Sequence, residues 1–151
     1  MAKTTPQKWI KFSLNEQLYE KIKNRKHKQL ADNVREDLEA FYALLNYGFA
    51  LARKKLTPKE AMLILDVMNG HLYTPSLSYM YAETGLITSV EDGCVLEDLD
   101  KKWGIDKVQL IEKLKSLPGY ARLALVDWAV GVWEQKPESI NEEELKKVFK
   151  G

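Results

Sequence analysis

The sequence has very few of the residues on which metal sites and disulfide frameworks depend. Among its 151 residues there is one cysteine, Cys94, and there are two histidines, His27 and His71. A single cysteine excludes an intramolecular disulfide, and these three residues lack the spacing of a zinc motif. We therefore expect no metal site and no cofactor, and the lone cysteine fits a reducing cytoplasmic compartment.

Long apolar runs are absent as well. The most apolar stretch, residues 120–133, is interrupted by Arg122 and Asp127, and it is shorter than the roughly 20 apolar residues that span a bilayer. The first 17 residues are polar and interrupted throughout, unlike a secretory signal. We expect an intracellular protein without a membrane partner, in which the apolar stretch forms a buried helix.

Motifs of catalysis are missing too. The chain contains no phosphate-binding glycine loop, no nucleophile elbow and no paired-histidine motif. A nucleophile pair of Cys94 and His71 would need the fold to bring them together, and a cysteine beside Val95 and Leu96 is more typical of a small buried group. The acids of residues 91–100 lack the spacing of a calcium loop and are interpreted as a solvated surface. We therefore expect no catalytic residues and no enzyme.

The charge is distributed unevenly along the chain. The first 30 residues contain eight basic and two acidic side chains, a net charge of +6, whereas the remaining 121 contain 15 basic and 20 acidic side chains, a net charge of −5. A basic end on an acidic body indicates that the end meets an anionic partner, most often nucleic acid or a membrane surface.

Hydrophobic periodicity predicts a mainly α-helical fold, with about seven helices and one short N-terminal strand. The strand is predicted by the alternating segment KWIKFSL, residues 8–14. Ser13 and Glu16 have the spacing of a capping box for a helix that ends near Arg25. Apolar residues from Leu30 to Ala52 keep to one face and predict a long amphipathic helix.

Capping residues mark the later helices. Thr57, Pro58 and Glu60 predict a helix start, and Asn69 with Gly70 predicts its end. Because this segment is apolar nearly all round, we expect it at the centre of the fold. Gly85 is predicted to end a short helix, and another short helix is predicted around residues 97–103. Further starts are predicted at Thr74–Pro75, Asp106, Pro118 and Ser139–Glu142.

Two domain organisations are compatible with these patterns. In the first, residues 1–55 form a basic strand-helix-helix unit and residues 56–151 form an acidic helical body, with a boundary near Lys54 to Thr57. In the second, the chain is a single integrated domain, which its length allows. The sequence leaves both open.

The N-terminal pattern of a strand, the helix SLNEQLYEKI and a second helix containing LADNVREDLEAFY resembles the ribbon-helix-helix family of DNA-binding proteins, over residues 8 to about 45. In that family two chains pair their strands into an antiparallel ribbon that enters the major groove, and four helices form the dimer core. The resemblance implies a homodimer that binds double-stranded DNA, as a transcriptional regulator does.

Carried onto this sequence, the resemblance assigns Ile10, Phe12 and Leu14 to the core of the dimer. It implies a DNA-binding set in which some residues face the groove, others hold phosphates and the start of the second helix offers backbone N–H groups. The groove-facing residues are Trp9, Lys11 and Ser13, and the phosphate-binding residues are Lys8, Lys26, Lys28 and Gln29. Lys11 is expected to contact guanine acceptors.

A second interpretation involves no nucleic acid. The chain would then be a small helical adaptor or inhibitor that docks on another protein through its basic end or its acidic helices. The basic residues of KIKNRKHK would in that case be a solvated turn, and Trp9, Ile10 and Phe12 would pack on the helical body. The sequence alone does not separate the two functions.

Overall fold

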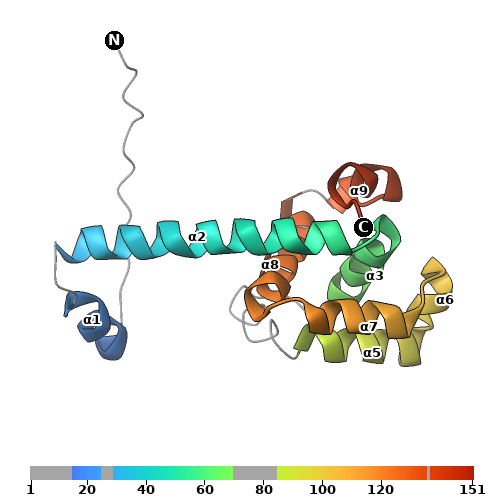
Figure 1. Cartoon of the computed structure of the whole chain (residues 1–151), viewed down its shortest axis with the longest axis horizontal. Coiled ribbons are helices and arrows are strands. Elements are labelled where there is room, and N and C mark those ends of the chain that lie inside the picture. Colours follow the sequence, from blue (N-terminus) through green and yellow to red (C-terminus); the bar gives the residue numbers. More distant parts are fainter. Residues whose placement is uncertain (1–14, 25–28, 70–84, 136) are drawn as a thin grey trace, which may run out of the picture. The chain divides into compact units, whose positions relative to one another are not determined.

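A computed structural model describes residues 15–24, 29–69, 85–135 and 137–151 (Figure 1). This part of the chain is mainly helical and contains eight α-helices and no strand. The strand predicted over residues 8–14 lies outside the described residues. None of the described helices combines the length and the apolar character needed to cross a membrane. The chain divides into two units, Met1–Ala40 and Phe41–Gly151.

The first unit contains α1 (Glu16–Lys23) and the first turns of α2, a helix that runs from Leu30 to Lys55. The predicted long amphipathic helix is thereby confirmed. The start of α1 differs from the prediction, because Asn15 rather than Ser13 occupies the N-cap, where its Oδ1 accepts a hydrogen bond of 2.8 Å from the Leu18 amide. Asparagine caps a helix as well as serine does, so the capping-box spacing alone does not fix the boundary.

The second unit is built around α3 (Pro58–Asn69). Eight of its 12 residues are buried, which confirms its predicted central position. It packs against four helices and α7 packs beside one of these, α5, as Figure 1 shows. These five helices are α5 (Gly85–Glu97), α6 (Leu99–Trp103), α7 (Lys107–Ser116), α8 (Gly119–Gln135) and α9 (Glu142–Val148).

Aromatic side chains join the second half of α2 to this core. The Phe49 ring lies 5.8 Å from Trp128 of α8 and 5.7 Å from Phe149, which follows α9, with distances measured between ring centroids. Trp128 and Phe149 are 4.9 Å apart in an edge-to-face arrangement. Such pairs add to the free energy gained by burial alone. Trp128 belongs to the apolar stretch of residues 120–133 that is predicted to form a buried helix, and this packing agrees with that prediction.

Two helix boundaries of the second unit differ from the prediction. Gly85, predicted to end a helix, instead begins α5. The last helix begins at Glu142 and is capped by the Asn141 side chain, whereas Pro137–Ser139 forms a separate 3-10 turn. The predicted cap at Asp106 is confirmed, because its Oδ1 accepts a 3.1 Å bond from the Gln109 amide. The helix predicted from Thr74–Pro75 lies outside the described residues.

Candidate nucleic-acid interface and exposed surfaces of the body

Most of the predicted DNA-binding set lies outside the described residues, namely Lys8, Trp9, Lys11, Ser13, Lys26 and Lys28. Gln29 is described, and it is exposed at the residue before α2. Its carbonyl accepts hydrogen bonds from the amides of Asp32 (3.0 Å) and Asn33 (3.2 Å). Gln29 thus begins the hydrogen-bonding pattern of α2, at the end of the helix where backbone N–H groups favour an anion.

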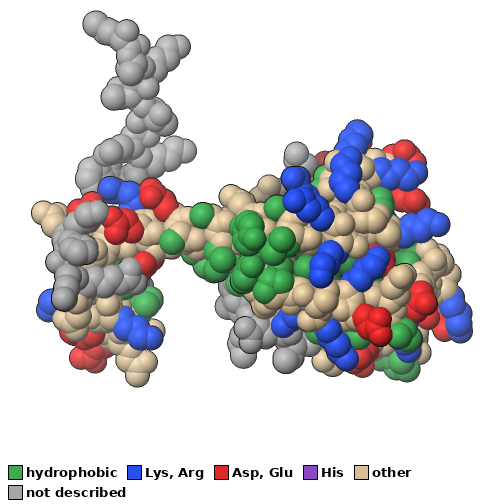
Figure 2. All heavy atoms as spheres, in the orientation of Figure 1, with side chains coloured by type: hydrophobic (Ala, Val, Ile, Leu, Met, Phe, Trp, Pro, Cys, Tyr) green, Lys and Arg blue, Asp and Glu red, His purple; other side chains and the backbone are tan. Residues whose placement is uncertain are grey.

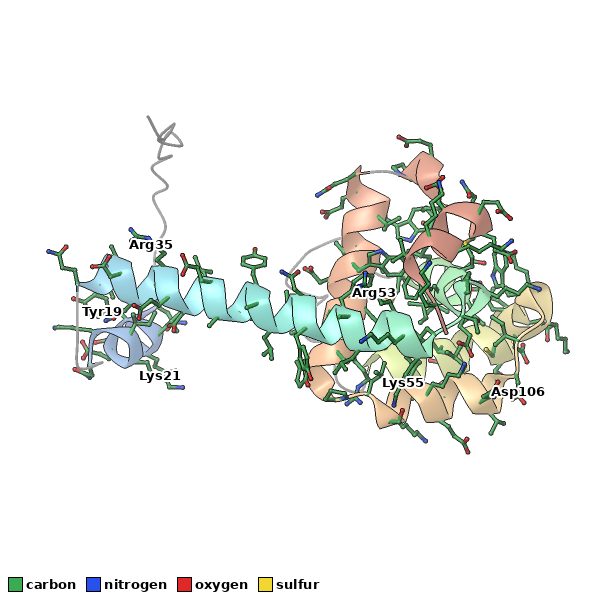
Figure 3. All side chains as sticks on the ribbon, turned by 45° about the horizontal axis from the view of Figure 1, so that its top comes forward. Tyr19, Lys21, Arg35, Arg53, Lys55 and Asp106 are labelled. Atoms are coloured by element: carbon green, nitrogen blue, oxygen red, sulfur yellow. The ribbon has the colours of Figure 1, made fainter. Side chains whose placement is uncertain are left out.

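Two further basic residues of the first unit, Lys21 and Lys23, are exposed on α1. Lys21 extends away from α2 into solvent (Figure 3). A third basic residue, Arg35, is exposed on α2, on the side opposite α1. The Lys23 ammonium lies 5.3 Å from the centre of the Tyr19 ring, a cation–π contact. Lys21 and Lys23 belong to the basic N-terminal charge, but sequence spacing did not select them as site residues. Their exposure on α1 adds them to the candidate interface.

The first unit buries few side chains. Among residues 15–24 and 29–40, only Ile22 and Asn33 are buried. The Asn33 amide donates a 3.1 Å hydrogen bond to the Ile22 carbonyl and so ties α2 to α1. Leu18 is 43%, Tyr19 37% and Leu38 52% exposed. Among the described residues, one buried apolar side chain contributes little toward offsetting the conformational entropy of two ordered helices.

Charged side chains of the second unit join its helices. Lys113 of α7 donates to both carboxylate oxygens of the buried Glu60, each at 2.9 Å, and Glu60 also accepts from the Thr57 amide at 2.8 Å. Asp66 of α3 accepts from Lys102 at 2.6 Å and from the Trp103 indole at 3.0 Å. Because these carboxylates already have partners, their evident role is to hold α3 against α6 and α7.

Cys94 is buried on the inner side of α5, as its apolar sequence neighbours predicted. Burial raises the pKa of its thiol, and the negative charge of Asp100 raises that pKa further. A thiol with a raised pKa stays protonated at neutral pH and is a weak nucleophile. His71 lies outside the described residues, which contain no cluster of metal-ligating side chains.

A groove of about 450 Å³ lies where the first turns of α3 and α7 approach α9. Its charged lining is mixed, with Lys59 and Lys146 opposed by Glu60, Asp106 and Glu142. Asp106 caps α7, and Glu142 lies 3.8 Å from the Lys146 ammonium. Because the lining mixes both signs of charge and four of these five side chains already have partners, the groove shows no clear preference for an anion or a cation.

The second unit carries two exposed apolar surfaces. Tyr42, Leu44 and Tyr47 are exposed on α2, where Figure 2 shows hydrophobic side chains gathered, and Tyr47 stacks on Tyr120 at 6.1 Å. At the end of the body formed by α5, α6 and α7, hydrophobic side chains lie among acidic and basic ones in Figure 2. The exposed apolar residues there are Val95, Leu96 and Val108.

The three comparisons with known proteins add no relative. No protein-family model, no curated protein and no solved structure matches this chain. The resemblance to ribbon-helix-helix proteins therefore stays a prediction from the residues, and the function is argued from the chain's own charge and packing.

Proposed function

We propose that this chain is a homodimeric DNA-binding protein that uses its basic N-terminal unit to hold duplex DNA. The observation that carries the proposal is the described part of the first unit, in which two helices bury one apolar side chain, Ile22, and leave Leu18, Tyr19 and Leu38 partly exposed. A second copy of the unit would cover these side chains. The unit also includes the first 30 residues, which carry the net charge of +6.

Dimerisation and DNA binding support each other physically. A lone ribbon strand would leave its hydrogen-bonding groups and its apolar face unsatisfied, whereas two copies satisfy both. A symmetric dimer also doubles the positive charge presented to the phosphates, which steers association and sets a steep dependence on salt. Exposed Lys21 and Lys23 and the start of α2 at Gln29 would contribute to phosphate binding.

The DNA-binding proposal predicts salt-dependent binding of the full chain to duplex DNA. Replacing Lys26 and Lys28 by alanine should weaken binding at least roughly tenfold at about 50 mM salt, and lower the slope of log affinity against log salt by about 2. Lys11→Ala should mainly reduce discrimination between sequences, by about 1–3 kcal/mol. Fluorescence anisotropy with labelled duplexes measures both effects.

A matched control variant shows whether DNA affinity depends on Lys26 and Lys28 themselves or only on the net charge of the chain. Lys146→Ala combined with Lys147→Ala removes the same charge from α9, where both lysines form only exposed ion pairs, so DNA affinity should change little. An equal loss in this control, or no duplex binding by the wild-type chain at low salt, would contradict the proposal. The adaptor function would then be favoured.

The dimer predicts a second result. Leu38→Asp should be harmless in a monomer, because Leu38 is 52% exposed, but it would place a charge in the proposed interface at a cost of several kcal/mol. We expect the wild type to sediment as a dimer and Leu38→Asp to sediment as a monomer in analytical ultracentrifugation. Val108→Asp on α7, also at an exposed position, should remain dimeric. A monomeric wild type would refute the dimer.

A further inference from the structure

The helix α5 is apolar on two sides. Leu86, Val90 and Cys94, spaced four residues apart, are buried against the core, whereas Val95 is 68% and Leu96 79% exposed on the other side. A helix that is apolar on both sides is normally covered on both. Single exposed apolar residues are common, but two neighbours on one face form a continuous patch.

The patch is surrounded by negative charge. Residues 86–100 contain five acidic side chains and no lysine or arginine. Glu91 and Asp92 lie one helical turn before Val95 and Leu96, so they share a face with these residues. In the described part of the chain no ion pair involves Glu91, Asp92 or the following Glu97. On α5 itself the apolar groups therefore lie among acidic side chains, while the lysines of this end of the body belong to α6 and α7.

The neighbouring helix extends this surface. α7 packs against α5, and its first turn carries Val108, which is 63% exposed. Glu112, one turn further along α7, is exposed as well. We define the α5 acidic face by Glu91, Asp92, Val95 and Leu96 of α5 together with Val108.

We propose that the α5 acidic face docks a basic amphipathic helix of a partner protein. The apolar side of such a helix would cover Val95, Leu96 and Val108, and its lysines or arginines would meet Glu91 and Asp92. Two copies of this chain that met through this face would place like charges opposite each other, which disfavours self-association here. The inference does not rest on DNA binding, because it involves a different unit and the opposite charge.

The test is an NMR titration of the full chain, with isotope-labelled methyl groups, against a synthetic peptide of about 14 residues, or four helical turns. In this peptide leucine recurs at helical spacing on one side, and lysine occupies the other. We expect the peptide to change the chemical shifts of the Val95, Leu96 and Val108 methyl groups most. We also expect its affinity to fall as the salt concentration rises. Two control peptides, one with glutamate for lysine and one with alanine for leucine, should each bind at least roughly tenfold more weakly.

Variants of the full chain test the location of the site. Leu96→Ser should weaken the lysine–leucine peptide roughly tenfold without affecting the fold, because the side chain is exposed. Glu91→Gln combined with Asp92→Asn should weaken it by roughly threefold to tenfold. The control Glu134→Gln combined with Glu138→Gln removes the same charge from exposed positions elsewhere, and it should leave the affinity unchanged.

Three outcomes would overturn the inference. The first is a set of peptide-induced shifts that lies elsewhere on the protein, or no shift at all. The second is equal weakening by the control variant, which would indicate non-specific charge attraction. The third is movement of the Val95, Leu96 and Val108 methyl signals with protein concentration in the absence of peptide, which would identify a second copy as the occupant.

Discussion

Replacing Glu60 by alanine is expected to lower the free energy of unfolding by about 3 kcal/mol. The Glu60 side chain is 4% exposed, and it accepts two hydrogen bonds of 2.9 Å from the Lys113 ammonium. Its loss leaves that ammonium without its partner in a site where the Lys113 side chain is only 24% exposed. It also removes the acceptor for the Thr57 amide at the start of α3. Urea unfolding of the full chain measures the change.

Companion variants separate the two roles of Glu60. Glu60→Gln keeps an oxygen that can accept from the Thr57 amide but removes the negative charge. It should therefore lower the free energy of unfolding by less than Glu60→Ala does. Combining Glu60→Gln with Lys113→Met removes the unpaired charge and should recover part of the stability. Lys146→Ala breaks only exposed ion pairs and should cost less than about 1 kcal/mol. A cost below this for Glu60→Ala would show that the buried pair is not structurally important.

Gly48→Val is expected to destabilise the protein by about 3 kcal/mol, and Gly48→Ala by about 1–2 kcal/mol. A Cβ atom on Gly48 would lie 2.8 Å from the Tyr120 carbonyl oxygen and 2.9 Å from the Ala121 Cα. Alanine raises helix propensity by about 1 kcal/mol, but here the clash is with backbone of α8. Only separation of α2 from α8 relieves that clash, so the steric cost exceeds the gain in propensity.

The same substitution elsewhere supplies the control. Gly131 lies within α8, and a Cβ added there would meet no neighbouring atom of the described residues within 4 Å. Gly131→Ala should therefore stabilise the protein by about 0.5–1 kcal/mol through helix propensity alone. Thermal unfolding of Gly48→Ala and Gly131→Ala shows whether each substitution lowers or raises the melting temperature. Stabilisation by Gly48→Ala would mean that α2 and α8 are not in close contact at this position.

Much of the helical body could be predicted because its boundaries are local. The capping box of Thr57 and Glu60 and the cap at Asp106 depend on residues three positions apart, and the structure contains both. The apolar character of α3 also predicted its central place. These features need no knowledge of distant contacts, since hydrogen-bonding groups and periodicity over one or two turns decide them.

The helix α5 could not be predicted in the same way. Its apolar residues face both sides, so no single helical stripe is evident, and Gly93 interrupts it. The packing explains this glycine, because a Cβ there would lie 2.9 Å from Leu99 Cδ1 and 3.0 Å from Val67 Cγ2. Tertiary contacts therefore favour a helix where local propensity disfavours one.

The prediction of the DNA interface rests mainly on the sequence, whereas the description of the helical body rests mainly on the structure. The net charge of +6 in the first 30 residues and the resemblance of residues 8–45 are properties of the sequence, and of the predicted site residues the structure describes Gln29. The exposed apolar groups on α1 and α2, by contrast, are identified only by the folded unit. An amphipathic pattern shows that a helix has an apolar side, but not whether the same chain covers it.

By itself, the sequence determined the helical class, the clearest helix starts and the separation of charge, because each depends on composition or on residues within a turn of one another. Only the tertiary structure decided that Glu60 pairs with Lys113 across 53 positions, that Gly48 lies against α8, and that Val95 and Leu96 remain in water. These features depend on which distant surfaces meet, and the free energy of such contacts is set by packing and burial in the folded chain.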